Sequence, residues 1–109
     1  MVAMMRNFEF FDAPHVAFIC MPKSFGVVNA LDIVIYLQTL TLVMQSHGVA
    51  SCAQGALDFY PDPIKEMLAI PEEQGIVVGL SFGYEDKFHP ANKTRTSRAN
   101  LDDSVVFLN

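Results

Sequence analysis

The stretch from Asn29 to Gly48, NALDIVIYLQTLTLVMQSHG, constrains the fold of this chain more than any other part of it. Asn29 is a suitable N-cap residue, and Asp32 places a carboxylate near the helix N-terminus, where negative charge is stabilising. Gly48 follows the last periodic residue, as a glycine often does after a helix. The pattern predicts one long helix over about residues 29–47.

This expected helix has two apolar faces when it is drawn at about 100° per residue. The first face consists of Ala30, Ile33, Leu37, Leu40 and Met44. The second face consists of Leu31, Ile35 and Leu42. Narrow polar stripes separate the faces: Asp32, Tyr36, Thr39 and Ser46 on one side, and Gln38, Thr41 and Gln45 on the other.

A surface helix needs only one apolar face, so the second must lie inside a large core or against a partner chain. A chain of 109 residues has few other elements to cover both faces, which favours the partner chain. Residues 25–44 are also long enough for a membrane span of about 20 residues. However, Asp32 falls inside that span, and a carboxylate at such depth costs about 2.5 kcal/mol or more. We therefore expect no membrane segment.

The composition is that of a folded chain, with 51% hydrophobic and 17% charged residues. A net charge of −5 argues against general nucleic-acid binding, which needs a basic face to neutralise phosphates. Four of the seven cationic residues nevertheless lie close together, at Lys87, Lys93, Arg95 and Arg98. The segment 84–109 is therefore expected to be a polar, locally basic C-terminal tail.

The two cysteines are not arranged as a metal or redox pair. Cys20 lies in an apolar run and is expected to be a buried small hydrophobic residue, whereas Cys52 lies near a glycine without an adjacent base to activate it. There is no CxxC motif and no leader pattern at the N-terminus. Two cysteines without such motifs predict a reduced, cytoplasmic setting for the protein.

Two continuous apolar runs, residues 14–21 and 75–83, are typical of strands buried on both faces, so both are expected to be central strands. A short strand is expected over 49–52 before a break at 53–55, and a last strand over 104–108. Asp62 followed by Pro63 predicts a short helix over 63–69. Strands interleaved with helices indicate a single α/β or α+β domain over residues 1–109.

Two segments have residue types suited to a ligand. Residues 93–98, KTRTSR, alternate cations with hydroxyls, and forked guanidinium donors suit phosphate oxygens. The alternative is a solvated charged loop. Residues 51–56, SCAQGA, form a small-residue loop against which a planar ligand can rest. The histidines His15, His47 and His89 lack metal-ligand spacing, and no GxSxG motif indicates a hydrolase.

Several motifs, in order along the chain, resemble the C-terminal half of the FMN-dependent nitroreductases. They are FFDAP, QTLTLVMQSHG, SCAQG, IPEE, GLSFGY and NKTRTSR. The resemblance implies an α+β sandwich that forms an obligate homodimer through the helix at 29–47, with the tail embracing the other subunit. It also implies an oxidoreductase in which FMN passes a hydride from NADH or NADPH to nitroaromatic or quinone acceptors, so no catalytic side chain and no metal are expected.

The same resemblance implies the binding residues. Cys52, Ala53, Gln54 and Gly55 match the loop whose backbone lies against the isoalloxazine ring of the flavin. Lys93, Arg95 and Arg98 match the tail cations that meet the FMN phosphate.

Two departures from the family pattern affect these expectations. Ala53 stands where the family commonly has proline, which loosens the loop. The Arg-Arg-Ser-x-Arg phosphate-binding motif and the Asn-rich loop that open the family domain are missing, so the chain is expected to be half of the usual domain. The alternative function is a non-catalytic dimerisation fragment that no longer binds flavin stably.

Overall fold

The computed structural model describes residues 2–108. Its helices are α1 (Val2–Met5), α2 (Val27–Ser46) and α3 (Asp62–Leu68), and its strands are β1 (His15–Pro22), β2 (Ala50–Gln54) and β3 (Gln74–Gly83). Short 3₁₀ helices are η1 (Arg6–Asp12), η2 (Gly55–Phe59), η3 (Pro90–Lys93) and η4 (Leu101–Asp103). The combination of one antiparallel sheet with helices is the expected α+β class.

The three strands pair in the order β1-β3-β2, and both pairings are antiparallel. The run at 75–83 is therefore confirmed as the central strand. The same expectation for 14–21 was wrong, because β1 lies at an edge of this three-stranded sheet and its residues are mostly half-buried. A continuous apolar run reports burial on both faces of a strand, whereas a central position depends on pairing along both edges.

One hydrophobic cluster joins β3 to η2 and α3, and Val78 and Leu80 of β3 are buried outside this cluster. Leu57 from η2, Ile64 from α3 and Ile76 from β3 pack together, with half-buried apolar side chains around them: Phe8, Phe10, Phe18, Cys20 and Ile70. Gly79 of β3 lies directly under Leu57, and a Cβ at this position would collide with the Leu57 side chain. A glycine is therefore required where η2 crosses the sheet.

Helix α2 begins two residues earlier than the sequence pattern indicated. Gly26 is the N-cap, and Asn29, expected there, is the third residue of the helix, where its Oδ1 accepts a hydrogen bond of 3.2 Å from the Gly26 N–H. Asn29 therefore stabilises the same helix end from inside the helix. At the other end, Gly48 adopts a left-handed φ of +74° as predicted.

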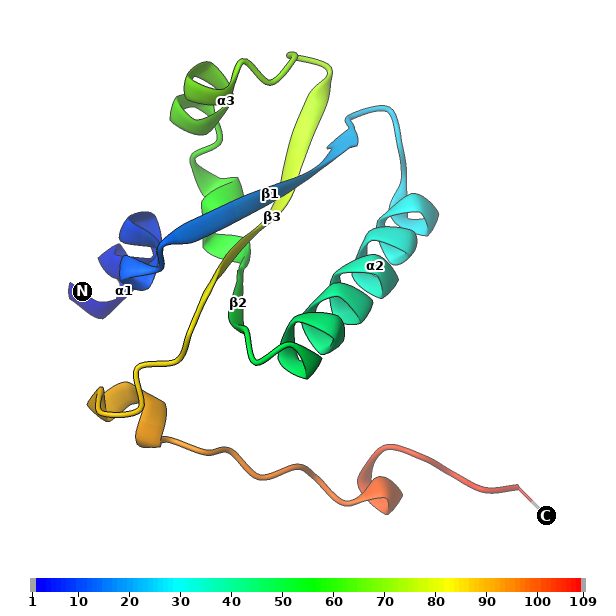
Figure 1. Cartoon of the computed structure of the whole chain (residues 1–109). Coiled ribbons are helices and arrows are strands. Elements are labelled where there is room, and N and C mark those ends of the chain that lie inside the picture. The colour runs from blue at the N-terminus through cyan, green and yellow to red at the C-terminus, as the bar shows by residue number, and fades with distance from the viewer. Residues whose placement is uncertain (1, 109) are drawn as a thin grey trace.

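The two apolar faces of α2 are in different environments. The face that contains Ala30, Ile33 and Leu37 is half-buried by the rest of the chain. On the second face, Leu31 and Ile35 are 56% and 66% exposed. Figure 1 shows α2 on one side of the sheet, with η2 and α3 on the other. The outward face of α2 therefore has no cover within residues 2–108.

By length and mean hydropathy (1.8), α2 is the one described helix that could span a membrane. One whole face of this helix is half-buried by its own chain, and Asp32 is exposed in its first half. Packing against its own chain therefore accounts for the apolar character of that face, and the outward face remains exposed within residues 2–108.

Three smaller expectations need correction. β2 continues through Gln54, past the break expected at 53–55. α3 already includes Asp62, with Pro61 as its N-cap, and it ends at Leu68 because Ala69 is left-handed at φ 52°. Residues 104–108 form no strand, since no described strand pairs with them.

The segment after β3 extends away from the body of the molecule, as Figure 1 shows from yellow to red. Only η3 and η4 are regular within it. The radius of gyration is 16.6 Å. A compact domain of this length is expected to have about 13 Å. The tail therefore adds to the dimensions of the chain without adding to its core.

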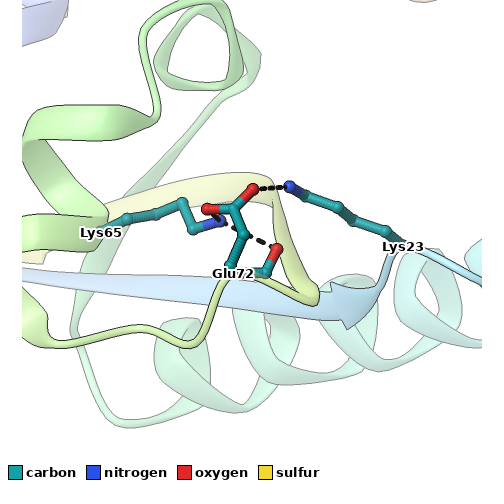
Figure 2. A network of polar contacts seen from close by, with 3 residues as sticks. All are labelled: Lys23, Lys65 and Glu72. Carbon is teal, nitrogen blue, oxygen red and sulfur yellow. Dashed lines mark hydrogen bonds and ion pairs between the residues drawn. The ribbon is translucent and has the colours of Figure 1, made fainter.

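Two lysines meet Glu72 in the turn before β3 (Figure 2). Lys65 of α3, whose side chain is 8% exposed, lies 3.0 Å from Oε2 of Glu72 and donates 3.2 Å to the Glu72 carbonyl. Lys23, just after β1, donates to the other carboxylate oxygen. The hydrogen bonds from Lys23 and Lys65 lower the pKa of Glu72 to about 2. This network joins the ends of β1, α3 and β3.

Candidate functional site

An open hollow of about 940 Å³ lies where β2 begins and β3 ends. Its walls come from the end of η1, the last turns of α2, the strand residues 50–52 and 81–83, and the segment 84–95. Pairing of Cys52 with Ser81 and of Ala50 with Gly83 sets the floor of this hollow. Four separate parts of the chain therefore converge on one space.

The loop at the end of β2 is exposed except for one side chain. Cys52, Ala53 and Gly55 are exposed, whereas Gln54 is 2% exposed. The Gln54 amide donates 2.9 Å to the carbonyl of Asn7 and 3.3 Å to Asn7 Oδ1, and it accepts a hydrogen bond from the Ser81 hydroxyl. The loop therefore presents its backbone outward while Gln54 points inward.

The three cations expected at a phosphate lie in or after η3, and all are exposed. The Arg95 guanidinium donates 2.6 Å to Oε1 of Glu85. The Arg98 guanidinium donates 3.0 Å to the Thr96 hydroxyl and 3.2 Å to the Ser97 carbonyl. The donors of Arg95 and Arg98 are thus held by neighbouring residues of the same tail.

The hollow brings together one residue from each of the two predicted groups. Cys52 from the loop and Arg95 from the tail both line it. The other expected residues are not among its lining residues: Ala53, Gln54, Gly55, Lys93 and Arg98. The structure therefore joins the loop and the tail at this hollow without bringing all seven residues into it.

Sequence reasoning missed several lining residues. Thr41 and Gln45 line the hollow, and both belong to the second polar stripe of α2, which was a readable signal. Phe10, Phe11 and Asp12 also line it, with left-handed φ values of 52°, 53° and 61°. Such values are costly for residues other than glycine and often mark functional sites. Within the FFDAP motif, the only signal of a turn is the Ala-Pro pair, because the residue before a proline is disfavoured in a helix.

The charges around the hollow nearly balance. Arg6 pairs with Asp12, and Arg95 pairs with Glu85, while Asp86 caps the following turn by accepting 2.9 Å from the Phe88 N–H. An anion entering the hollow must therefore compete with carboxylates for the guanidinium groups.

The two cysteines differ in exposure. Cys52 is exposed on the wall of the hollow, whereas Cys20 is half-buried beside the core. Burial raises the pKa of the Cys20 thiol, which disfavours the reactive thiolate. The expectation that Cys20 behaves as a small hydrophobic residue agrees with this environment.

Comparison with known proteins identifies the relatives of this chain. The model of the Nitroreductase family matches residues 2–84. The nitroreductase NfnB of Mycolicibacterium smegmatis is 40% identical over 102 residues, which are 94% of this chain and 43% of the relative. A 4-nitrobenzoate reductase of Nocardioides sp. is 39% identical over 104 residues, covering 94% of this chain and 42% of that protein.

Solved structures agree with this comparison. The FMN-dependent nitroreductase NfnB from Mycobacterium smegmatis in complex with NADPH gives a TM-score of 0.91 at 38% identity, over 95% of this chain and 46% of that one. The FMN- and NADPH-dependent NfnB from Sphigopyxis sp. strain HMH gives a TM-score of 0.93 at 26% identity, over 99% of this chain and 48% of that one. This chain thus spans a little under half the length of these relatives, and it belongs to the nitroreductase family.

Proposed function

We propose that this chain contributes one half of the FMN site of a nitroreductase that oxidises NADH or NADPH. The relatives supply the activity class, since they are named as nitroreductases and 4-nitrobenzoate reductases, and two solved relatives are described as FMN-dependent with NADPH. In this chain itself, the observation that supports the proposal is the hollow, because Cys52 from the loop and Arg95 from the tail both line it.

The residues present fit a flavin nucleotide in size and charge. A hollow of about 940 Å³ is within the range of cofactor sites, which is about 300–1,000 Å³. Cys52 on the wall of the hollow, with the exposed Ala53 and Gly55 beside it, offers a surface for the isoalloxazine ring. Arg95, with Lys93 and Arg98 on the same tail, offers donors for the phosphate. The chemistry that FMN supplies when bound is hydride transfer from NADH or NADPH to a nitroaromatic or quinone acceptor.

The proposed functional unit is a homodimer. The outward face of α2 carries Leu31, Val34, Ile35 and Leu42, which are all more than half exposed. The tail at 84–108 extends from the body and ends in the exposed residues Val106, Phe107 and Leu108. Exposed apolar surface of this extent is typical of an interface. A second copy that covers α2 and receives the tail would bury both features.

We also propose a cytoplasmic setting for the enzyme. Cys20 and Cys52 are both free, which agrees with a reducing compartment.

The second candidate is a dimerisation fragment without stable flavin. Two observations favour it. Arg95 is already paired with Glu85, and neither Lys93 nor Arg98 lines the hollow. The phosphate would then find too few free donors within residues 2–108 to offset its desolvation.

A visible absorption spectrum of the purified protein distinguishes these two functions. A flavin band that survives gel filtration, together with oxidation of NADH or NADPH in the presence of 4-nitrobenzoate, supports the enzyme. A dimer that stays colourless after incubation with FMN and gel filtration, even with the part of the Mycolicibacterium smegmatis relative that this chain does not span added in trans, supports the fragment.

A further inference from the structure

Three polar side chains from three different elements meet directly beneath the exposed loop. They are Asn7 of η1, Gln54 at the end of β2 and Ser81 of β3, and the side chains of Gln54 and Ser81 are only 2% and 3% exposed. Ser81 pairs with Cys52 in the sheet, so Gln54 is its diagonal neighbour on the same face. η1 brings Asn7 onto that face.

The hydrogen bonds of this network allow only one orientation of the Gln54 amide. Its nitrogen donates to the Asn7 carbonyl at 2.9 Å and to Asn7 Oδ1 at 3.3 Å, and its oxygen accepts from the Ser81 hydroxyl. A rotation that exchanged nitrogen and oxygen would place the amide oxygen against two acceptors on Asn7. Since an unpaired buried amide is costly, the Gln54 side chain is locked in place.

This lock acts where the pairing of β2 with β3 ends. Ala53 pairs with Leu80 and Gln54 with Gly79, whereas the exposed Gly55 follows the strand and has open space where a Cβ would lie. β2 is also an edge strand among residues 2–108, so its outer backbone groups have no strand partner there. The inward side chain of Gln54 therefore adds to the pairing on one edge in holding the backbone of 53–55.

We propose that Asn7 and Ser81 are positioning residues for the flavin ring: by holding Gln54, they set the backbone of residues 53–55 against which the ring rests. This inference depends on the proposed function for the ring itself. It assigns a task to the Ser81 hydroxyl, which is buried on a largely apolar strand and donates to Gln54.

The test compares Ser81→Ala with Ser24→Ala. Ser24 is exposed between β1 and α2, does not line the hollow, and its hydroxyl forms no hydrogen bond within residues 2–108. Ser81→Thr keeps the hydroxyl and serves as the rescue variant. The first readout is amide hydrogen exchange of the peptide covering 52–57, which requires no flavin. The second is titration with FMN and with riboflavin up to millimolar concentration, with the visible spectrum of the bound flavin recorded.

For Ser81→Ala we expect the amide hydrogens of 52–57 to exchange at least about tenfold faster than in the unmodified chain. The reason is that Oε1 of Gln54 loses the hydrogen bond that it accepts from the Ser81 hydroxyl. We expect the binding of FMN and of riboflavin to weaken by the same factor, because the loop contacts the ring and not the phosphate. The visible absorption band of the bound flavin should also change. Ser24→Ala and Ser81→Thr should behave like the unmodified chain. A merely structural role for Ser81 would loosen the whole sheet and leave the spectrum of the remaining bound flavin unchanged.

The outcomes separate the two proposals. Unchanged exchange at 52–57 in Ser81→Ala overturns the positioning role, whatever the flavin does. Loosening of the entire sheet, or an unchanged flavin spectrum, also overturns it. Faster exchange confined to 52–57 leaves the anchoring of the loop in place; if no variant then binds either flavin, even with the part of the Mycolicibacterium smegmatis relative that this chain does not span added in trans, the proposed flavin function is overturned.

Discussion

The ammonium of Lys65 lies 3.0 Å from Oε2 of Glu72, although the lysine is buried and the glutamate is exposed. Lys23 contacts the other oxygen of the same carboxylate, so one exposed acid satisfies a buried cation and an exposed one. The three residues connect the end of β1 to α3 and to the turn that starts β3 (Figure 2). This arrangement makes the stability of the fold depend on pH.

Glu72→Gln should remove an acid-sensitive part of that stability. The pKa of Glu72 is lowered from 4.5 to about 2 in the folded chain. The contribution of its charge is therefore present above pH 4.5 and is lost as the pH falls toward about 2. Urea midpoints of the unmodified chain and of Glu72→Gln should differ at pH 7 and converge near pH 2.

The control for this prediction is Glu73→Gln, in the same turn, since the Glu73 side chain forms no ion pair within residues 2–108. It should follow the unmodified chain across the pH range. A constant gap between the unmodified chain and Glu72→Gln from pH 7 to pH 2 would show that the network does not depend on the charge.

Substitution on the outward face of α2 should dissociate the dimer. Ile35→Asp places a carboxylate in an apolar interface, and we expect at least a tenfold weaker association, or about 1.4 kcal/mol. Sedimentation velocity at several concentrations measures this. Gln38→Asp adds the same charge to a polar stripe of the same helix and should leave association unchanged. A folded monomer of the unmodified chain at micromolar concentration would remove the basis of the interface proposal.

The tail cations should discriminate between FMN and riboflavin. Each charge-assisted hydrogen bond to the phosphate is worth about 1.5 to 3 kcal/mol, or roughly 10- to 150-fold in affinity. Arg95→Ala and Arg98→Ala should therefore lower the affinity for FMN by this factor and leave the affinity for riboflavin nearly unchanged. Lys87→Ala, an exposed cation of the same tail, is the control. If the arginine variants lost both ligands equally, the cations would be acting through folding.

Much of the fold could be predicted because it is encoded in local periodicity. The two apolar faces of α2 follow from the spacing of residues such as Leu31 and Leu37, but helix geometry alone does not say which face the rest of the chain covers. The left-handed Gly48 likewise follows from a local rule for helix ends. By contrast, the edge position of β1 depends on which strands pair, and no local pattern in 14–21 contains that information.

The candidate site could be predicted only in part, for a similar reason. The motif resemblance indicated Cys52 and Arg95, but the partners of Gln54 lie 47 residues away at Asn7 and 27 away at Ser81. Contacts between residues so distant in sequence arise from the sheet register and from the turn at Phe10 and Phe11. A left-handed conformation at two phenylalanines opposes their intrinsic preference, so propensity could not predict it.

The central claim is that these 109 residues contain the ring loop and tail cations of an FMN site, but not enough of the site to bind FMN tightly. Fluorescence titration of the purified chain with FMN tests it most directly, alone and with the segment of the Mycolicibacterium relative that this chain does not span added in trans. Relative to a complete site, the loss of two charge-assisted phosphate contacts should cost about 3 to 6 kcal/mol, on the order of a hundredfold to ten-thousandfold in affinity. We therefore predict weak or undetectable FMN binding by the chain alone and a gain of that size with the added segment. Tight stoichiometric FMN in the 109-residue chain by itself, or no FMN binding even with the segment present, would contradict the claim.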